Sequence, residues 1–218
     1  MTKVLVLGAT GRTGKLIIEE LAKNQSLQII AAIRKANDIS RLPKIERKIK
    51  THLVDIENAE SIEKAIEQVD IIVHAIRLRG NIPENALVEL DKRIRQAIPP
   101  TKEIPMIIVG GAGSLKMNSG KYFWEDPHFP TQTLPRGRAH AQLRIYLEEH
   151  SFKDKWAYLV PPPAYIPEGI RLGTYKQAEL DLEEDFLNEQ ISYSDFAIAI
   201  SDAVREEWQG VHLIASST

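Results

Sequence analysis

The stretch VLVLGATGRTGK, residues 4–15, places a run of aliphatic residues directly against three glycines spaced three apart. A continuous aliphatic run indicates a buried strand, and the GKLIIEELAKN that follows has the apolar spacing of a helix. Such a strand, turn and helix let an anion approach bare backbone, with the first N–H groups of the helix pointing at it. The alternative is a turn that only reverses the chain. The stretch therefore predicts a dinucleotide phosphate site formed by Gly8, Thr10, Gly11, Thr13 and Gly14.

Strand-like and helix-like segments alternate along most of the chain. Strands are expected at residues 3–8, 27–34, 50–56, 70–76, 104–111, 155–160 and 211–216. Helices are expected at residues 14–24, 58–69, 84–98, 136–150 and 191–208, with Asn58 capping the second and Ser192 or Ser194 the last. This alternation predicts an α/β fold, a doubly wound parallel sheet of the Rossmann type. We expect one NAD(P)-binding domain over residues 1–218, in which about 161–218 form a small C-terminal substrate lobe.

The composition excludes several classes of protein. Lys and Arg total 28 against 30 Asp and Glu, so no basic field argues for nucleic acid. The absence of cysteine excludes a disulfide framework and a thiolate zinc site, and we expect no metal. Apolar runs such as residues 27–33 are far shorter than the ~20 residues of a membrane helix, and the first strand leaves no room for a signal peptide. We expect a cytoplasmic protein that binds neither nucleic acid nor membrane.

Two arginines favour NADP(H) over NAD(H). Arg12 lies in the first helical turn, where the helix dipole disfavours a cation unless an anion is bound nearby. After the second strand, where NAD sites place an acidic residue, the chain has Arg34 and no carboxylate until Asp38. Arginine grips a phosphate through two hydrogen bonds, so Arg12 and Arg34 are expected to converge on the 2′-phosphate. The alternative for Arg34 is an ordinary solvated charge.

Further cofactor contacts are expected where other strands end. Asp55 follows the third strand and can accept from the adenine amino group, with the backbone of Ile56 at a ring nitrogen. A turn-forming role for Asp55 is equally simple. Ala75 and Ile76 follow the fourth strand and are expected beside the ribose and diphosphate. The arginines of RLR, residues 77–79, either touch phosphate or stay solvated.

Taken in order, GATGRTGK, Arg34, VGGAGSL, WAYLVPPPAYIPEG and ISYSDFAIAI resemble the NAD(P)H-binding atypical short-chain dehydrogenase/reductases. The likeness extends to their NADH-flavin reductase branch, related to biliverdin reductase B/flavin reductase and to NmrA-like proteins. The resemblance implies the Rossmann fold, phosphate contacts from the glycine turn, and Gly110 and Gly111 beside the nicotinamide ribose. It also implies that Ser114 stands where ordinary members keep a catalytic serine. The alternative is a serine that caps a turn.

One feature of the ordinary dehydrogenases is absent. They use Tyr-x-x-x-Lys for proton transfer, and no tyrosine of this chain has a lysine four residues on. Alcohol oxidation by that route, and sugar-nucleotide epimerisation, are therefore not expected. His140, on the helix after the fifth strand, is the candidate proton relay because a free histidine titrates near neutrality. The alternative is a half-buried packing histidine.

A flavin or quinone suits a site without that acid, because hydride goes to an electron-poor ring and water can supply the proton. The loops at 115–135 and 161–176 carry aromatic side chains that either stack on such an acceptor or anchor the loops. They are Tyr122, Phe123, Trp124, Phe129, Tyr165 and Tyr175. The sequence thus predicts an NADPH-dependent reductase of a planar acceptor. The alternative is a non-catalytic NADP(H) sensor of the NmrA type with a protein partner, and the short C-terminal region favours the enzyme.

Overall fold

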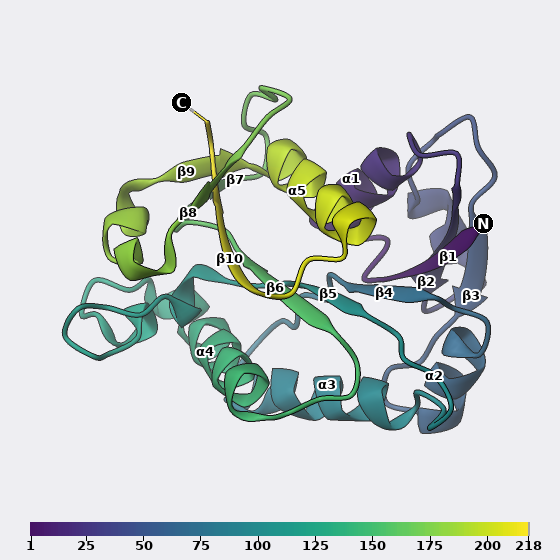
Figure 1. Ribbon diagram of the computed structural model, residues 1–218, viewed down its shortest axis with the longest axis horizontal. Helices are drawn as coiled ribbons and strands as arrows, with labels where there is room; N and C mark the ends of the chain where they lie inside the picture. The colour runs from purple at the N-terminus through teal and green to yellow at the C-terminus, as the bar shows by residue number, and fades with distance from the viewer. Residues whose placement is uncertain (218) are drawn as a thin grey trace.

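The chain forms alternating strands and helices, and the computed structural model describes residues 1–217 (Figure 1). The strands are β1 (Thr2–Leu7), β2 (Leu27–Ile33), β3 (Lys50–Leu53), β4 (Ile71–His74), β5 (Met106–Val109), β6 (Trp156–Val160), β7 (Ala164–Ile166), β8 (Lys176–Ala178), β9 (Gln190–Ser192) and β10 (Gly210–Ala215). The α-helices are α1 (Arg12–Leu21), α2 (Ala59–Ile66), α3 (Ala86–Gln96), α4 (Leu134–Glu149) and α5 (Tyr193–Glu206).

The main sheet has the strand order β3-β2-β1-β4-β5-β6-β10-β8. All neighbours from β3 to β10 are parallel, and only β8 at the edge is antiparallel. The order reverses between β1 and β4, and in open α/β sheets ligands bind at the carboxyl ends of the strands beside such a reversal. The predicted doubly wound parallel sheet of the Rossmann type is confirmed.

Helices cover both faces of the sheet, with α1 and α5 above it and α2, α3 and α4 below it in Figure 1. The alternation of β1 side chains explains this arrangement, because successive residues of a strand point to opposite faces. Val4 and Val6 belong to the core on the α1 and α5 side, whereas Leu5 and Leu7 belong to the core on the other side. No helix among residues 1–217 has the length and apolar character needed to cross a membrane.

Local sequence signals predicted the starts of α2 and α5, although they left the cap of α5 open between Ser192 and Ser194. Asn58 caps α2 and Ser192 caps α5, and each side chain accepts the backbone N–H of the residue three positions on. The third strand is shorter than expected and ends at Leu53. Beyond it the Asp55 carboxylate accepts the backbone N–H of Glu57 at 3.0 Å, which makes a turn of the segment that the pattern assigned to the strand.

The C-terminal segment from residue 161 is only partly separate from the main body. The helix α5 packs against α1, and β10 extends the main sheet beside β6. The short strands β7 and β9 pair in a small sheet of their own. A buried ion pair ties the loop before β9 to α4, because Arg144 donates to both carboxylate oxygens of Glu183 at 2.7 Å. Of residues 161–218, α5 and β10 therefore belong to the main body.

Candidate functional site

The turn between β1 and α1 requires its glycines for close backbone packing. Gly8 has φ +81°, and a Cβ there would lie 2.4 Å from the carbonyl oxygen of Ala75. A Cβ on Gly14 would lie 2.2 Å from the Gly8 carbonyl oxygen, so Gly14 allows α1 to start directly against the turn. Gly11 is the N-cap residue, and no side chain caps the helix there. The first N–H groups of α1 are thus available to an anion.

A cavity of about 530 Å³ opens above this turn at the carboxyl ends of β1, β2 and β4. Most of the residues predicted to bind the cofactor line it, namely Gly8, Thr10, Gly11, Arg34, Ile56, Ala75 and Ile76. Its position at the uncapped start of α1, with the glycine backbone of Gly8 and Gly11 in its wall, suits the diphosphate of a dinucleotide. We call this space the cofactor cavity.

Six predicted cofactor residues do not line this cavity, namely Arg12, Thr13, Gly14, Asp55, Gly110 and Gly111. Gly14 is buried behind the turn and serves packing. Asp55 is exposed outside the cavity, where its carboxylate holds the turn to Glu57, so the turn-forming alternative describes it. Arg12 and Thr13 line a neighbouring pocket, of which Arg34 is not part. The expected convergence of Arg12 and Arg34 on one phosphate is therefore not observed.

Arg41 takes the place beside Arg34 that the sequence assigned to Arg12. It lines the cofactor cavity together with Arg34 and Asp38. The Asp38 carboxylate accepts from Arg41 Nη1 at 2.9 Å and from the Lys35 backbone N–H at 3.2 Å. The bond from Arg41 keeps the pKa of Asp38 below its usual value. The carboxylate of Asp38 is thus paired with Arg41, whereas Arg34 forms no ion pair within residues 1–217. The three-residue spacing of Asp38 and Arg41 is typical of a helical ion pair, and this spacing in the sequence could have indicated their contact.

A second cavity, of about 470 Å³, lies beyond β4 and β5, and its volume lies in the range of small-molecule sites. Gly110, Gly111, Thr13 and His140 line it, as do Phe123, Phe129, Tyr165, Tyr193 and the prolines at 161–163. Tyr122, Trp124 and Tyr175 lie outside it. Sequence reasoning did not predict that Tyr193 lines this cavity, because the pattern around it indicated only a helix. Tyr193 is the first residue of that helix, α5. We call this space the second cavity.

His140 borders the second cavity as a neutral imidazole. Its Nδ1 lies 3.0 Å from the Tyr158 hydroxyl, and its ring lies over Gly111, where a Cβ would come within 2.6 Å of His140 Cδ2. Burial is the main cause that lowers the pKa of His140 to about 4, and His74 and Arg136 nearby add to it. His140 is half-buried, as in the packing alternative, and its lowered pKa does not favour a proton relay at neutral pH.

Ser114 does not reach the second cavity. It is fully buried, and its hydroxyl donates to the Gly111 carbonyl at 2.8 Å, as in a turn. The Tyr158 hydroxyl can donate to Ser114 Oγ at 3.4 Å, and burial raises the pKa of this tyrosine. Ser114 therefore approaches a bound molecule only through Tyr158 and His140. Sequence reasoning missed Tyr158 because it lies on β6, although a tyrosine in a buried strand needs a polar partner.

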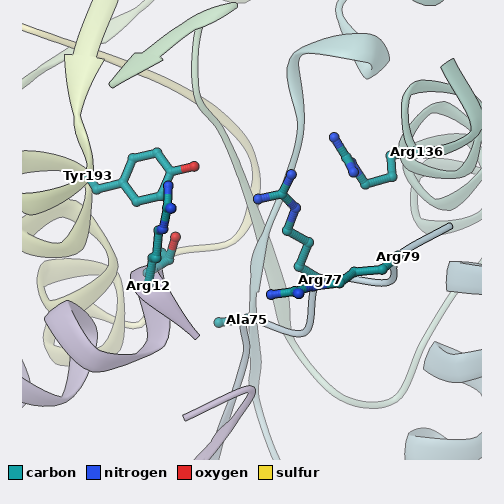
Figure 2. Close-up of a pocket in the computed structure, with 7 residues that line it drawn as sticks. Arg12, Ala75, Arg77, Arg79, Arg136 and Tyr193 are labelled. Atoms are coloured by element: carbon teal, nitrogen blue, oxygen red, sulfur yellow. The ribbon is translucent and has the colours of Figure 1, made fainter. Parts of the chain in front are cut away.

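Between the two cavities lies a pocket walled by arginines, which we call the arginine pocket. Figure 2 shows that Arg12, Arg77, Arg79 and Arg136 surround it, together with Ala75 and Tyr193. Ala75 and Arg77 line the arginine pocket and both cavities, so the three spaces are neighbours along the carboxyl edge of the sheet. Among residues 1–217 no group of three or more His, Asp or Glu residues is arranged to hold a metal ion.

The fold and the glycine turn define a dinucleotide-binding protein. Residues 8–207 match the NAD(P)H-binding family, and since this match covers most of the chain, the chain belongs to that family. It is 26% identical over 205 residues to the uncharacterized protein YwnB of Bacillus subtilis (strain 168), which covers 92% of this chain and 91% of YwnB.

Two solved structures share the fold. The structure of a "putative NADH-flavin reductase" from Streptococcus pneumoniae TIGR4 superimposes with a TM-score of 0.80 at 22% identity, over 100% of both chains. A short-chain dehydrogenase/reductase from Veillonella parvula DSM 2008, in complex with NADP, superimposes with a TM-score of 0.67 at 16% identity, over 99% of this chain and 95% of that one. The chain is thus a member of the NAD(P)H-binding family, and its fold is that of these two structures.

Proposed function

We propose that this protein is an NADPH-dependent reductase that transfers hydride to a planar acceptor such as a flavin or quinone. The observation that carries the proposal is the common border of the two cavities at Ala75, Ile76 and Arg77. A dinucleotide on the glycine turn and a ring system in the second cavity would meet at this border. The name of the Streptococcus pneumoniae relative points to the same chemistry.

NADPH, when bound, supplies a hydride from its nicotinamide ring. Gly8, Gly11 and the start of α1 would hold its diphosphate, and Gly110 and Gly111 would flank the nicotinamide half. The preference for NADP(H) rests on Arg34 and on the pairing of Asp38 with Arg41, which leaves Arg34 as the charge open to a 2′-phosphate. The NADP complex of the Veillonella parvula relative supports this choice.

The chain's part in the reaction is to bind, orient and exclude water. Phe123, Phe129 and Tyr193 offer apolar surface to a flat ring. Because the pKa of His140 is about 4, its imidazole is uncharged at neutral pH and does not act as a general acid. When the Tyr158 hydroxyl donates to Nδ1, the His140 Nε2–H can donate a hydrogen bond to an acceptor carbonyl without releasing its proton. Solvent then supplies the proton, as suits flavins and quinones.

Anaerobic stopped-flow measurement of NADPH oxidation against flavins, quinones and aldehydes tests the proposal. We expect turnover with flavins or quinones and none with aldehydes. Phe129→Leu, which alters the wall of the second cavity, is expected to raise the KM for the acceptor several-fold. Trp124→Leu is the matched control from the same loop, because Trp124 lies outside this cavity. Tight NADPH binding without turnover of any acceptor would refute the reductase and favour the NmrA-type sensor.

A further inference from the structure

The arginine pocket gathers four positive charges that have no acidic partner. Arg12 comes from the start of α1, Arg77 and Arg79 from the loop after β4, and Arg136 from α4 (Figure 2). No Asp or Glu lines the pocket. None of the four guanidinium groups forms an ion pair or hydrogen bond within the described chain, although twelve other Lys and Arg side chains, from Lys23 to Arg205, do form ion pairs there.

Gathering these cations is unfavourable without an anion. Arg136 is partly buried, and its burial, followed by the charges of Arg77 and Arg79, lowers its pKa. Arg12, Arg77 and Arg79 are exposed, so solvent screens part of the repulsion among the four like charges, and a bound anion would offset the rest. The pocket therefore has the character of an anion site.

The cofactor diphosphate does not account for every arginine of the pocket. Arg77 and Arg79 also border the cofactor cavity, and Arg12 belongs to the helix that starts at the glycine turn. Arg136 borders the second cavity and not the cofactor cavity. Arg77 is the other arginine of the second cavity. These two residues are thus placed to meet a ligand in that cavity.

We propose that Arg136 and Arg77 bind an anionic group, a phosphate, carboxylate or sulfonate, that is attached to the planar ring of the acceptor. This inference rests on the proposed function and narrows its substrate class to anionic acceptors. The ring would lie against the aromatic wall of the second cavity, and the anion would reach the arginine pocket, which shares Thr13 and Tyr193 with that cavity. Arginine suits this task because its planar fork pairs with two oxygens of such a group.

FMN and riboflavin test the inference directly, because they share one ring and differ by a phosphate. Binding is followed by flavin fluorescence in the presence of NADP⁺, so that no turnover is needed. We expect the protein to bind FMN at least about tenfold more tightly than riboflavin, which corresponds to one charge-assisted contact. The preference should shrink at high salt. A naphthoquinone and its sulfonate, compared in the same way, show whether sulfonate replaces phosphate.

Arg136→Gln should remove most of the preference for FMN and leave riboflavin and NADP⁺ binding unchanged. Arg138→Gln is the matched control, since Arg138 lies on the same helix, is exposed, and stacks over Trp124 outside both cavities. If Arg136→Gln does not fold, Arg77→Gln from the exposed loop should reduce the same preference.

Two results would overturn the inference. The first is that the unaltered protein binds FMN and riboflavin with equal affinity. The second is that Arg136→Gln loses as much affinity for NADP⁺ as for FMN. Turnover separates this inference from the reductase. If FMN binds through Arg136 but no NADPH is oxidised, the reductase proposal is refuted and the anion site is supported. If the unaltered protein and the variant reduce both flavins equally, the reductase is supported and the anion site is refuted.

Discussion

Arg34→Gln should weaken NADPH binding and leave NADH binding nearly unchanged. Arg34 is exposed at the end of β2, lines the cofactor cavity and has no ion pair within the described residues. A hydrogen bond to a charged group contributes about 1.5–3 kcal/mol. Solvent around Arg34 screens its charge and Arg41 remains nearby, so we expect about 1–2 kcal/mol, or about 5–30-fold in Kd.

Isothermal titration calorimetry with NADPH and NADH, at low salt and again at high salt, measures both affinities. Lys35→Gln is the matched control, since Lys35 is the next residue, is also exposed and does not line the cavity. The control removes the same charge and should change neither Kd by more than about twofold. Equal weakening of NADPH and NADH by Arg34→Gln, or equal weakening of NADPH by Lys35→Gln, would show that Arg34 does not recognise the 2′-phosphate.

Three further predictions concern the buried ionisable groups. Because the pKa of His140 is about 4, the rate of NADPH oxidation should vary little between pH 6 and 8. His140→Ala should lower this rate by less than about tenfold. A thousandfold lower rate with unchanged NADPH affinity would show that His140 is a dedicated acid. Burial also lowers the pKa of His74 to about 4, so below pH 6.5 the unfolded chain binds protons that the folded chain rejects. Stability in urea should therefore fall from pH 6.5 towards pH 5 by about 1.4 kcal/mol per pH unit for each of the two histidines, and a flat profile would contradict their burial. Glu183→Gln leaves Arg144 buried without its paired carboxylate and should lower the free energy of unfolding in urea by about 3–5 kcal/mol. Glu189→Gln, which breaks the more exposed ion pair with Lys176, should lower it by less than about 1 kcal/mol.

The sequence by itself determined the class of fold and the position of the cofactor turn. Continuous aliphatic runs such as Val4–Leu7 are typical of strands buried on both faces of a parallel sheet, and the glycine spacing from Gly8 to Gly14 suits a tight strand-to-helix turn. The caps at Asn58 and Ser192 were equally readable, because a cap depends on residues three positions apart. Each of these signals is local in the chain.

Only the tertiary structure decided how distant side chains converge at the site. Arg41, rather than Arg12, lies beside Arg34, because a long side chain takes its direction from packing that its position in the chain does not reveal. His140 meets Tyr158 from another element, and burial takes its pKa far from the free value. Arg77, from the loop after β4, and Arg136, from α4, come together only when the chain is folded. Such contacts, and the charges that they tune, depend on burial and on distances across the sheet, which no spacing along the chain encodes.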